Sequence, residues 1–161
     1  MAKLLNEYKG IMMNKTKLKN YTYLCGPMED CSEEHMTGWR NKVSDQLELS
    51  DIAVLDPTRR VSFHDQLTDL QDQSKSRNTC QRIFKQDMQD IADSKIVIAD
   101  IRRSSGRGTG TSMELMFAHL KNKIIILVAD EDDFIHPFYE SMYTEKHYNF
   151  DDAVEAVRSY Y

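Results

Sequence analysis

A glutamate follows a glycine-rich run in GRGTGTSMEL, the stretch at residues 106–115. Glycines let the backbone approach a ligand closely, and the apolar residues after them predict a helix whose N-terminus favours an anion. Glu114 would lie one turn into this helix, where the helix dipole stabilises an ionised carboxylate. Such a carboxylate can attack the anomeric carbon of a sugar. Glu114 is therefore a candidate nucleophile beside a candidate ligand-binding loop that includes Gly108 and Gly110.

The same stretch has a purely structural interpretation. Thr111 and Glu114 are three residues apart, as in a capping box, in which threonine is the N-cap and the glutamate bonds back to its backbone. On this pattern alone capping is favoured. The two interpretations exclude each other, because a carboxylate folded back onto Thr111 cannot at the same time point at a sugar. The run is neither a P-loop nor a dinucleotide fingerprint, because it lacks the required lysine and the GxGxxG spacing.

A second carboxylate, Asp87, lies in the run FKQDMQDI at residues 84–91. The spacing of Phe84, Met88 and Ile91 predicts a helix with these side chains in the core, which puts Asp87 beside the buried face. One interpretation is an ordinary acid on a helix surface. The other is a general acid whose pKa is raised by partial burial and by a nearby carboxylate.

Other reactive residue types give weaker signals. The five histidines show no paired ligand spacing, so no metal is expected. Cys25, at the end of an apolar run, is interpreted as a small buried hydrophobic residue rather than a nucleophile. Asp56 and Asp100 each end an apolar run, where an aspartate either forms a turn or faces a ligand.

The elements that would position these residues alternate along the chain. Apolar runs predict strands at residues 21–25, 52–55, 95–100 and 123–129, with a short fifth strand near 142–147. Apolar residues at three- and four-residue spacing predict helices at 36–47, 80–91, 113–120 and 150–157, and a polar loop covers 58–78. Continuous apolar strands are covered on both faces, so the sequence predicts a three-layer α/β fold with a mostly parallel sheet of five strands. Ligands of such sheets bind beyond the carboxyl ends of the strands.

Length and composition bound the possibilities. The 161 residues, 40% hydrophobic and 29% charged, fit one domain at residues 21–161. Residues 1–20 form a polar leader, interpreted as mobile, with a targeting role as the alternative. The net charge of −5 argues against nucleic-acid binding, and no apolar run reaches the length of a membrane span. Three cysteines without a CxxC pair indicate a reducing compartment, so a cytoplasmic location is expected.

Several segments together resemble one known family. YLCGPM at residues 23–28 resembles the YLAGP strand and loop that open the nucleoside 2-deoxyribosyltransferase family. QDMQDI at 86–91, with the strand after it, is similar to the aspartate helix of that family, and GTSMEL at 110–115 is similar to its catalytic block. HPF at 136–138 resembles its late loop. The segments occur in the family's order, from about residue 21 to the C-terminus.

The resemblance implies a flavodoxin-like or Rossmann-like sheet and cleavage of an N-glycosidic bond without a metal or organic cofactor. Glu114 would be the nucleophile on C1′ of the deoxyribose, Asp87 would donate or share a proton with the leaving base, and Tyr23 would orient Glu114. It also implies a homo-oligomer, a dimer or larger, in which a neighbour closes the pocket. The substrate-binding positions expected from the resemblance and from the strand ends are Gly26, Pro27, Met28, Thr58, Arg59, Asp100, Gly108, Gly110 and Thr111.

Departures from the family pattern leave the 5′ group of the substrate open. Met116 stands where the family often has glycine, and Gly108 stands where deoxyribosyltransferases carry an acid, six residues before the nucleophile. The related nucleoside 5′-monophosphate N-glycosidases have a phosphate-binding serine near that position, which is missing too. The arginines that favour a phosphate are Arg59, Arg60, Arg102, Arg103 and Arg107. The acids Glu29 and Asp30 disfavour it.

Four functions are therefore in competition. The leading hypothesis is a transferase that moves deoxyribose from one base to another base or to water. The first alternative is a hydrolase that removes the base from a (deoxy)nucleoside 5′-monophosphate. A non-catalytic nucleotide-sensing module would share the fold, since fold alone does not establish activity. An NAD-cleaving enzyme of the TIR type also uses a glutamate, but no other motif supports it.

Overall fold

The computed structural model describes residues 20–28, 31–60, 76–103 and 108–161. Its central element is a parallel sheet. Its strands are β1 (Tyr21–Cys25), β2 (Ala53–Leu55), β3 (Ile96–Asp100), β4 (Ile124–Val128) and β5 (Glu145–His147). All neighbouring pairs run parallel, in the order β2-β1-β3-β4-β5. This is the flavodoxin-like order, so the predicted fold class is confirmed.

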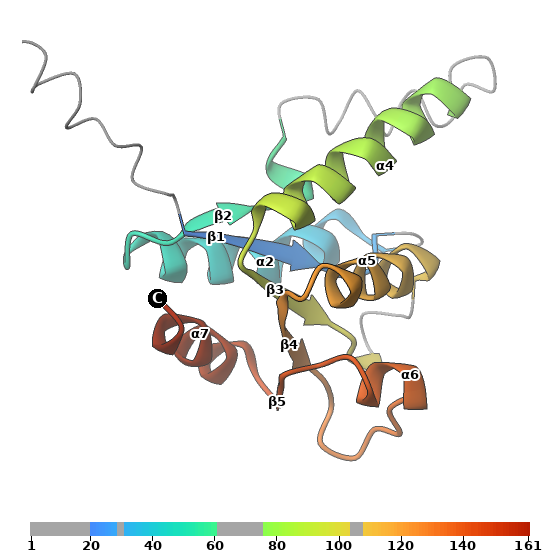
Figure 1. The fold of residues 1–161 in the computed structure, drawn as a ribbon. Coiled ribbons are helices and arrows are strands. Elements are labelled where there is room, and N and C mark those ends of the chain that lie inside the picture. The colour runs from blue at the N-terminus through green and yellow to red at the C-terminus, as the bar shows by residue number, and fades with distance from the viewer. Residues whose placement is uncertain (1–19, 29–30, 61–75, 104–107) are drawn as a thin grey trace, which may run out of the picture.

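Helices cover both faces of this sheet. The long helices are α2 (Glu33–Glu48), α4 (Ser76–Asp93), α5 (Thr109–Leu120) and α7 (Phe150–Ser159), and the short ones are η1 (Pro57–Arg59) and α6 (Pro137–Glu140). In Figure 1, α4 and α5 lie on one side of the sheet, while α2 and α7 lie on the other. The molecule therefore has three layers.

Local sequence signals explain where α2 and α7 begin. The Ser32 side chain accepts a hydrogen bond from the His35 backbone N–H at the start of α2. The Asn149 side chain likewise accepts one from Asp152 at the start of α7. Both helices carry two acidic residues in the first turn, where the helix dipole favours them.

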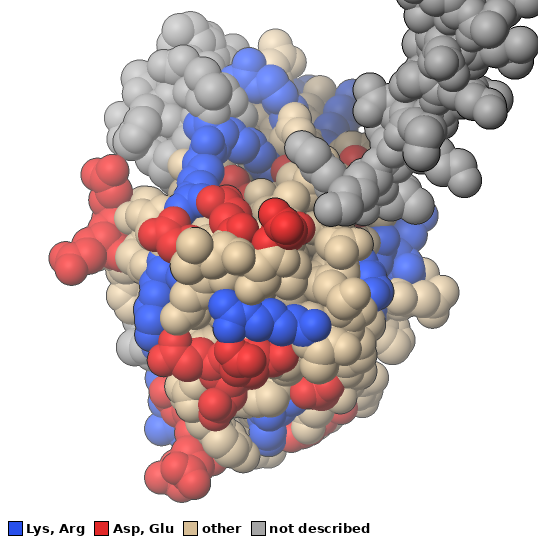
Figure 2. Space-filling view, turned by 90° about the vertical axis from the view of Figure 1, so that its left-hand side faces the viewer, with Lys and Arg blue, Asp and Glu red and all other residues tan. Residues whose placement is uncertain are grey.

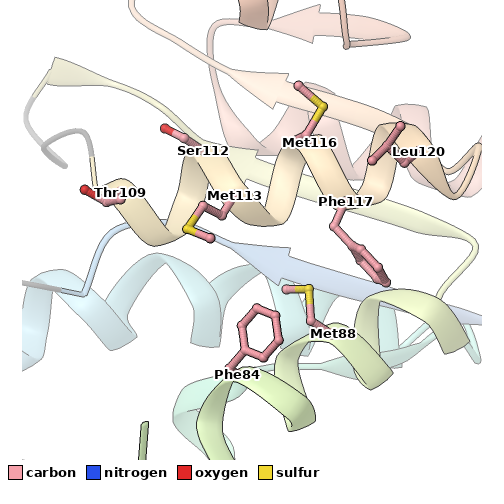
Figure 3. A pocket seen from close by; sticks show the side chains of 8 residues that line it. All are labelled: Phe84, Met88, Thr109, Ser112, Met113, Met116, Phe117 and Leu120. Carbon is pink, nitrogen blue, oxygen red and sulfur yellow. The ribbon is translucent and has the colours of Figure 1, made fainter. Parts of the chain in front are cut away.

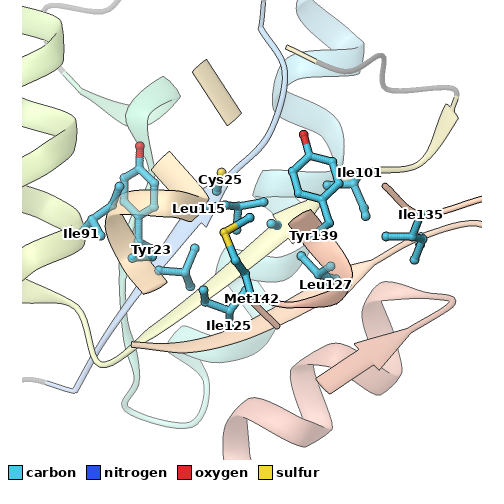
Figure 4. Close-up of a cluster of buried hydrophobic side chains, with 14 residues drawn as sticks. Tyr23, Cys25, Ile91, Ile101, Leu115, Ile125, Leu127, Ile135, Tyr139 and Met142 are labelled. Carbon is cyan, nitrogen blue, oxygen red and sulfur yellow. The ribbon is translucent and has the colours of Figure 1, made fainter. Parts of the chain in front are cut away.

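Alternation along β1 divides its side chains between two cores. Tyr23 and Cys25 point to the α4–α5 side, where they join a buried cluster with Ile91 and Leu115 (Figure 4). Leu24 points to the opposite side and packs in a second cluster with residues of α2 and α7. Side chains two apart on a strand share a face. The sheet therefore presents Tyr23 and Cys25 together to the helices that carry the candidate acids.

The predicted elements are present, with shifted ends. β2 begins at Ala53, α4 begins at Ser76, and the short helix α6 has no counterpart in the sequence prediction. The predicted loop at 58–78 contains η1 and the start of α4, and its residues 61–75 lie outside the described residues. The proposed leader also lies outside them, except for Asn20.

The prediction that Phe84 lies in the core is wrong, and most of the apolar stripe that marks α5 in the sequence is exposed as well. Met113, Met116 and Leu120 are 58%, 40% and 69% exposed, and Phe84 of α4 is 53% exposed. The buried face of α5 instead carries Thr111, Glu114, Leu115 and Ala118. The helix has two apolar sides, and its periodicity does not tell which of them meets the sheet.

Charged side chains of both signs are interspersed on the face shown in Figure 2. Ion pairs join neighbouring elements, such as Lys42 with Asp151 at 2.9 Å and Arg59 with Asp45 at 2.8 Å. Within the described ranges, none of the helices is both long enough and apolar enough to cross a membrane.

Candidate active site

The candidate catalytic residues meet at the point where the strand order reverses. β1 and β3 are neighbours at the centre of the sheet, and the chain leaves them toward opposite faces. Tyr23 comes from β1, Asp87 from α4 and Glu114 from α5. The Tyr23 hydroxyl donates a hydrogen bond of 2.9 Å to Oε1 of Glu114. Ligands of flavodoxin-like sheets bind at this switch point.

Helix α5 begins three residues earlier than the capping hypothesis requires. Its N-cap is Gly108, which leaves Thr111 and Glu114 inside the helix. The Glu114 carboxylate accepts hydrogen bonds from Tyr23 and from the Cys25 thiol, whose Sγ lies 2.9 Å from Oε2. The capping-box interpretation is therefore wrong, and the carboxylate is held toward the sheet.

Burial sets the protonation of Glu114. The residue is 9% exposed, and its pKa is raised from 4.5 to about 7, mainly by burial. The Cys25 and Tyr23 hydrogen bonds and the charge of Arg40 lower this pKa, whereas the charge of Asp87 raises it. The carboxyl group therefore changes charge near neutral pH, in the range where a nucleophile or base can act.

The two groups that hold Glu114 stay protonated. Burial is the largest cause that raises the pKa of the Tyr23 hydroxyl well above 10.0 and that of the Cys25 thiol well above 9.0. The charge of Glu114 raises both further. Both groups are therefore hydrogen-bond donors to the carboxylate, and neither is a nucleophile. The sequence analysis did not predict that Cys25 donates to Glu114. The two-residue spacing of Cys25 from Tyr23 could have indicated that both side chains lie on the same face of the strand.

Asp87 is buried and paired with an arginine. It is 7% exposed, and its Oδ1 lies 2.6 Å from Nη1 of Arg60, whose Nη2 contacts Asp90 at 2.7 Å. Burial raises the pKa of Asp87, and the charge and hydrogen bond of Arg60 oppose this rise. Nothing in the sequence indicated that Arg60 would pair with Asp87, because the two residues belong to different elements.

The loop after β1 approaches α2 closely. A Cβ on Gly26 would lie 2.9 Å from Cζ2 of Trp39 and 3.2 Å from Nη2 of Arg40, so only glycine fits there without displacement. The Gly26 carbonyl accepts a 2.8 Å hydrogen bond from Arg40. Arg40 is fully buried and lies 3.8 Å from Asp56. Sequence reasoning missed this buried arginine, which fixes the loop that carries Pro27 and Met28.

Three of the remaining candidates lie at the N-terminus of α5. Thr111 is 4% exposed, and its hydroxyl has no hydrogen-bond partner among the described residues. A Cβ on Gly108 would lie 3.5 Å from that hydroxyl and 3.6 Å from Pro27. Gly108, Thr111 and Pro27 are thus neighbours, while nothing lies within 4 Å of a Cβ placed on Gly110. Their contacts with a substrate stay a prediction.

The candidates after β2 and β3 contact their own neighbours. The Thr58 hydroxyl donates to Asp56 at 2.8 Å. Arg59 pairs with Asp45 and Glu48 of α2 at 2.8 and 3.0 Å. The guanidinium of Arg102 donates two hydrogen bonds, of 2.8 and 2.9 Å, to the carboxylate of Asp100. The structure brings these residues to the carboxyl edge of the sheet, and their role in binding a base stays a prediction.

Four of the five arginines considered for phosphate binding are paired with acidic side chains. Arg60 contacts Asp87 and Asp90, and Arg103 contacts Asp133 at 2.7 Å. Arg59 and Arg102 have the acidic partners given above. Arg107, Glu29 and Asp30 lie outside the described residues. In the part of the chain that the structure describes, no group of three or more His, Cys, Asp or Glu side chains is arranged to hold a metal ion.

An apolar groove of about 490 Å³ lies between α4 and α5 (Figure 3). Phe84 and Met88 of α4 face Met113 and Phe117 of α5 across it. A second pocket of about 330 Å³ reaches α6 and shares Ser112 and Met116 with the first. The groove lies on the two helices that carry Asp87 and Glu114, but neither acid lines it.

Comparison with known proteins gives a family and a fold. The family model described as "Nucleoside 2-deoxyribosyltransferase" matches residues 22–154. A search of curated protein sequences found no match.

Three solved structures are similar to this chain. A 2-deoxyribosyltransferase from Bacillus psychrosaccharolyticus has a TM-score of 0.65 and 20% identity, covering 83% of this chain and 90% of that one. The CMP N-glycosidase of Clostridium botulinum has a TM-score of 0.54 and 14% identity, covering 88% and 100%. A conserved protein from Enterococcus faecalis V583 has a TM-score of 0.66 and 12% identity, covering 89% and 99%. At these identities the likeness shows the shared fold.

Proposed function

The chain belongs to the nucleoside 2-deoxyribosyltransferase family, and from this premise we propose that it transfers deoxyribose from a 2′-deoxynucleoside to another base or to water. Members of this family are enzymes that act on nucleosides or nucleotides as glycosyltransferases or N-glycosidases. One observation carries the proposal for this chain. The buried carboxylate of Glu114 is held by Tyr23 and Cys25, each at 2.9 Å, with a pKa of about 7.

In the proposed reaction, a carboxylate oxygen of Glu114 attacks C1′ of the deoxyribose. The C1′–N bond breaks and its electron pair leaves with the base, which takes up a proton. The transition state resembles an oxocarbenium ion, which the negative charge of Glu114 stabilises. A glutamyl-deoxyribose ester results. A nitrogen of a second base, or a water oxygen, then attacks C1′ from the opposite side, gives up its proton to the Asp87 carboxylate and releases Glu114, so configuration is retained overall.

Asp87 supplies or shares the proton that the leaving base needs. The charge of Asp87 raises the pKa of Glu114, so a negative charge on Asp87 disfavours the ionised form of Glu114. The productive state has Glu114 ionised and Asp87 protonated. Arg60, at 2.6 Å from Asp87, favours the ionised form of Asp87, so it stabilises the carboxylate that is left once the proton has moved to the base.

A base-exchange assay tests the proposal. The protein is incubated with a 2′-deoxynucleoside and a different free base, and in parallel with the corresponding 5′-monophosphate. The proposal predicts a new deoxynucleoside in the first mixture. Release of base from the monophosphate alone would instead support the hydrolase. Binding of nucleotides without turnover in either mixture would support a sensing module.

The alternative substrate is a (deoxy)nucleoside 5′-monophosphate. Gly108 favours it, because no acidic side chain is present there to meet the sugar, and the CMP N-glycosidase shares the fold. The paired arginines weigh against it. Arg60, Arg102 and Arg103 each contact a carboxylate, and a phosphate would have to displace these partners. We therefore keep the nucleoside transferase as the leading proposal.

We further propose that the enzyme acts as a homo-oligomer in the cytoplasm. The groove between α4 and α5 exposes apolar side chains such as Phe84, Met113 and Leu120, and an exposed apolar patch of this kind is typical of an interface. A second copy of the chain is the occupant that we propose for this surface, because the groove lies on the two helices that carry Asp87 and Glu114. The family resemblance likewise implies that a neighbour closes the pocket.

A further inference from the structure

We propose that Cys25 is a positioning residue: its thiol holds Oε2 of Glu114 while the Tyr23 hydroxyl holds Oε1, so that two donors from one strand fix the plane of the carboxylate and favour its charged form. The inference rests on the proposed role of Glu114 as the nucleophile. In this role Cys25 forms no bond to the substrate and acts only through Glu114.

The geometry singles out Cys25 among the buried polar groups. Its Sγ lies 2.9 Å from Oε2 of Glu114, which equals the distance between Tyr23 Oη and Oε1. The backbone of Cys25 is fixed by its pairing with Ala99 of β3. Figure 4 shows Tyr23 and Cys25 on the same side of β1, as expected for residues two apart on a strand. The carboxylate is thus held at both oxygens from a rigid element.

The thiol is also placed to give up its hydrogen bond. It has one proton to donate, and a second acceptor, the backbone carbonyl of Thr111, lies 3.8 Å from Sγ. When Glu114 forms an ester with the sugar, the carboxylate loses its negative charge. The thiol proton can then turn toward the Thr111 carbonyl, so Cys25 keeps a partner in both states. A thiol is a weaker donor than a hydroxyl, so this release costs little.

Four groups act on the charge of Glu114, and Cys25 can be separated from the others. Asp87 of α4 opposes ionisation, while Arg40 of α2 and the two donors of β1 favour it. Replacing Cys25 by alanine removes one donor and leaves the charges of Asp87 and Arg40 in place. Alanine stands at this position in the YLAGP segment of the family, so the variant is compatible with the fold. Serine keeps a donor and makes it stronger.

The first test is the S–H stretching band in the infrared spectrum of the intact protein, which needs no catalytic activity. We expect one band at the low frequency of a strongly hydrogen-bonded thiol, absent from Cys25→Ser and shifting as Glu114 ionises near pH 7. In Glu114→Gln this shift with pH should disappear. A band that is the same in wild-type protein and Glu114→Gln, and that does not respond to pH, would overturn the inference.

The second test is the acid limb of the pH profile of kcat/KM. Cys25→Ala should move this limb upward by about one pH unit, which lowers kcat/KM about tenfold below the limb. Cys25→Ser should move it downward or leave it in place, because the donor is kept. The exposed Cys80 provides a control, and Cys80→Ser should leave the profile unchanged. Thermal melting curves establish that both proteins are folded. Equal pH profiles of kcat/KM for wild type and Cys25→Ala would then overturn the inference.

The two tests also separate this inference from the proposed function. If no glycosidic activity is found but the S–H band follows the ionisation of Glu114, the proposed function fails and the thiol–carboxylate contact stands. If activity is present but the band ignores Glu114, the inference about Cys25 fails and the proposed function stands.

Discussion

At the scale of single residues, the buried charge of Glu114 opposes folding. Its pKa is about 7 in the folded chain against 4.5 for an ordinary glutamate. Between these values the folded state keeps a proton that the unfolded state has lost. The free energy of unfolding therefore falls as the pH rises from 4.5 to about 7, by about 3 kcal/mol in total. A cost of this kind is expected if Glu114 acts as the proposed nucleophile, since active sites often give up stability for function.

Glu114→Gln is expected to be inactive and more stable than the wild type. Glutamine has nearly the same shape and no charge, so at about pH 8 the variant should gain about 1–3 kcal/mol in unfolding free energy. At about pH 5 the difference should be much smaller, because Glu114 is then largely protonated in the folded state. Urea unfolding at the two pH values measures this. The exposed Glu131 gives a control, Glu131→Gln, and equal stabilities of wild type and Glu114→Gln at both pH values would contradict the account.

Asp87 and Asp90 form a matched pair around Arg60. Both contact the guanidinium, at 2.6 and 2.7 Å, but only Asp87 appears among the causes that raise the pKa of Glu114. Asp87→Asn should lower kcat by about a hundredfold or more, because the leaving base loses its proton donor. It should also move the acid limb of kcat/KM to lower pH, because a negative charge near Glu114 is removed. Steady-state kinetics across pH measure both effects.

Asp90→Asn is the control for that pair. It breaks the same kind of contact with Arg60 without removing the carboxyl group of Asp87, the proposed proton donor. It should change kcat only a few-fold. If Asp90→Asn and Asp87→Asn were equally impaired, the loss would come from misplacement of Arg60, and the acid role of Asp87 would be refuted.

At the scale of elements, the loop after β1 packs closely against α2, and this packing fixes the position of the loop at the edge of the candidate site. Gly26→Ala places a methyl group 2.9 Å from Trp39 and 3.2 Å from Arg40, so it should destabilise the fold by about 1–3 kcal/mol. It should also lower activity, because the strand that carries Tyr23 and Cys25 leads directly into this loop. Chemical denaturation and the base-exchange assay measure the two effects.

Gly38→Ala provides the matched comparison. Gly38 lies within α2, and a Cβ there meets nothing within 4 Å. This change should raise stability by up to about 1 kcal/mol through helix propensity alone. A destabilisation of the same size in both variants would mean that the contact with Trp39 and Arg40 is not what requires Gly26.

The strands could be predicted because continuous apolar runs are a strong signal for covered parallel strands. The start of α5 could not, because glycine and threonine are both acceptable N-caps, and Gly108 rather than Thr111 takes that place. Arg40 is fully buried, although charge in a helical pattern normally indicates exposure. Its burial depends on packing against Gly26 and Asp56, and no local sequence pattern indicates contacts with other elements of the fold.

The candidate site was predictable in part for the same reason. Motif order led to Tyr23, Asp87 and Glu114, and the structure brings them together. The contact of Arg60 with Asp87 joins different elements, so spacing could not reveal it. The exposed side of α5 could not be told from its buried side, because Met113 and Leu115 are equally apolar and only the fold decides which one faces the sheet.

At the scale of the whole molecule, the apolar surface over α4 and α5 should hold a second copy. Leu120 is 69% exposed and lines the groove of Figure 3. Leu120→Glu places a charge in the proposed interface and should dissociate the oligomer, with activity falling at the same protein concentrations. Light scattering after size-exclusion chromatography measures the mass of wild type and variant.

Leu49→Glu is the control for the apolar surface. Leu49 is 87% exposed and follows α2, on the opposite side of the sheet from α4 and α5. The variant should keep the wild-type mass. A wild-type protein that stays monomeric at all concentrations tested, or equal effects of the two substitutions, would contradict the proposed interface.

The central claim is that Glu114 bonds covalently to the sugar, and rapid-quench mass spectrometry tests it most directly. Wild-type protein is mixed with a 2′-deoxynucleoside in the absence of an acceptor base, quenched in acid and measured intact, then mapped by peptides. The account predicts a mass increase of one deoxyribosyl group on the peptide that contains Glu114, formed together with an equal amount of free base and absent from Glu114→Gln. Free base released without any adduct through the time course, or an adduct that persists in Glu114→Gln, would contradict it.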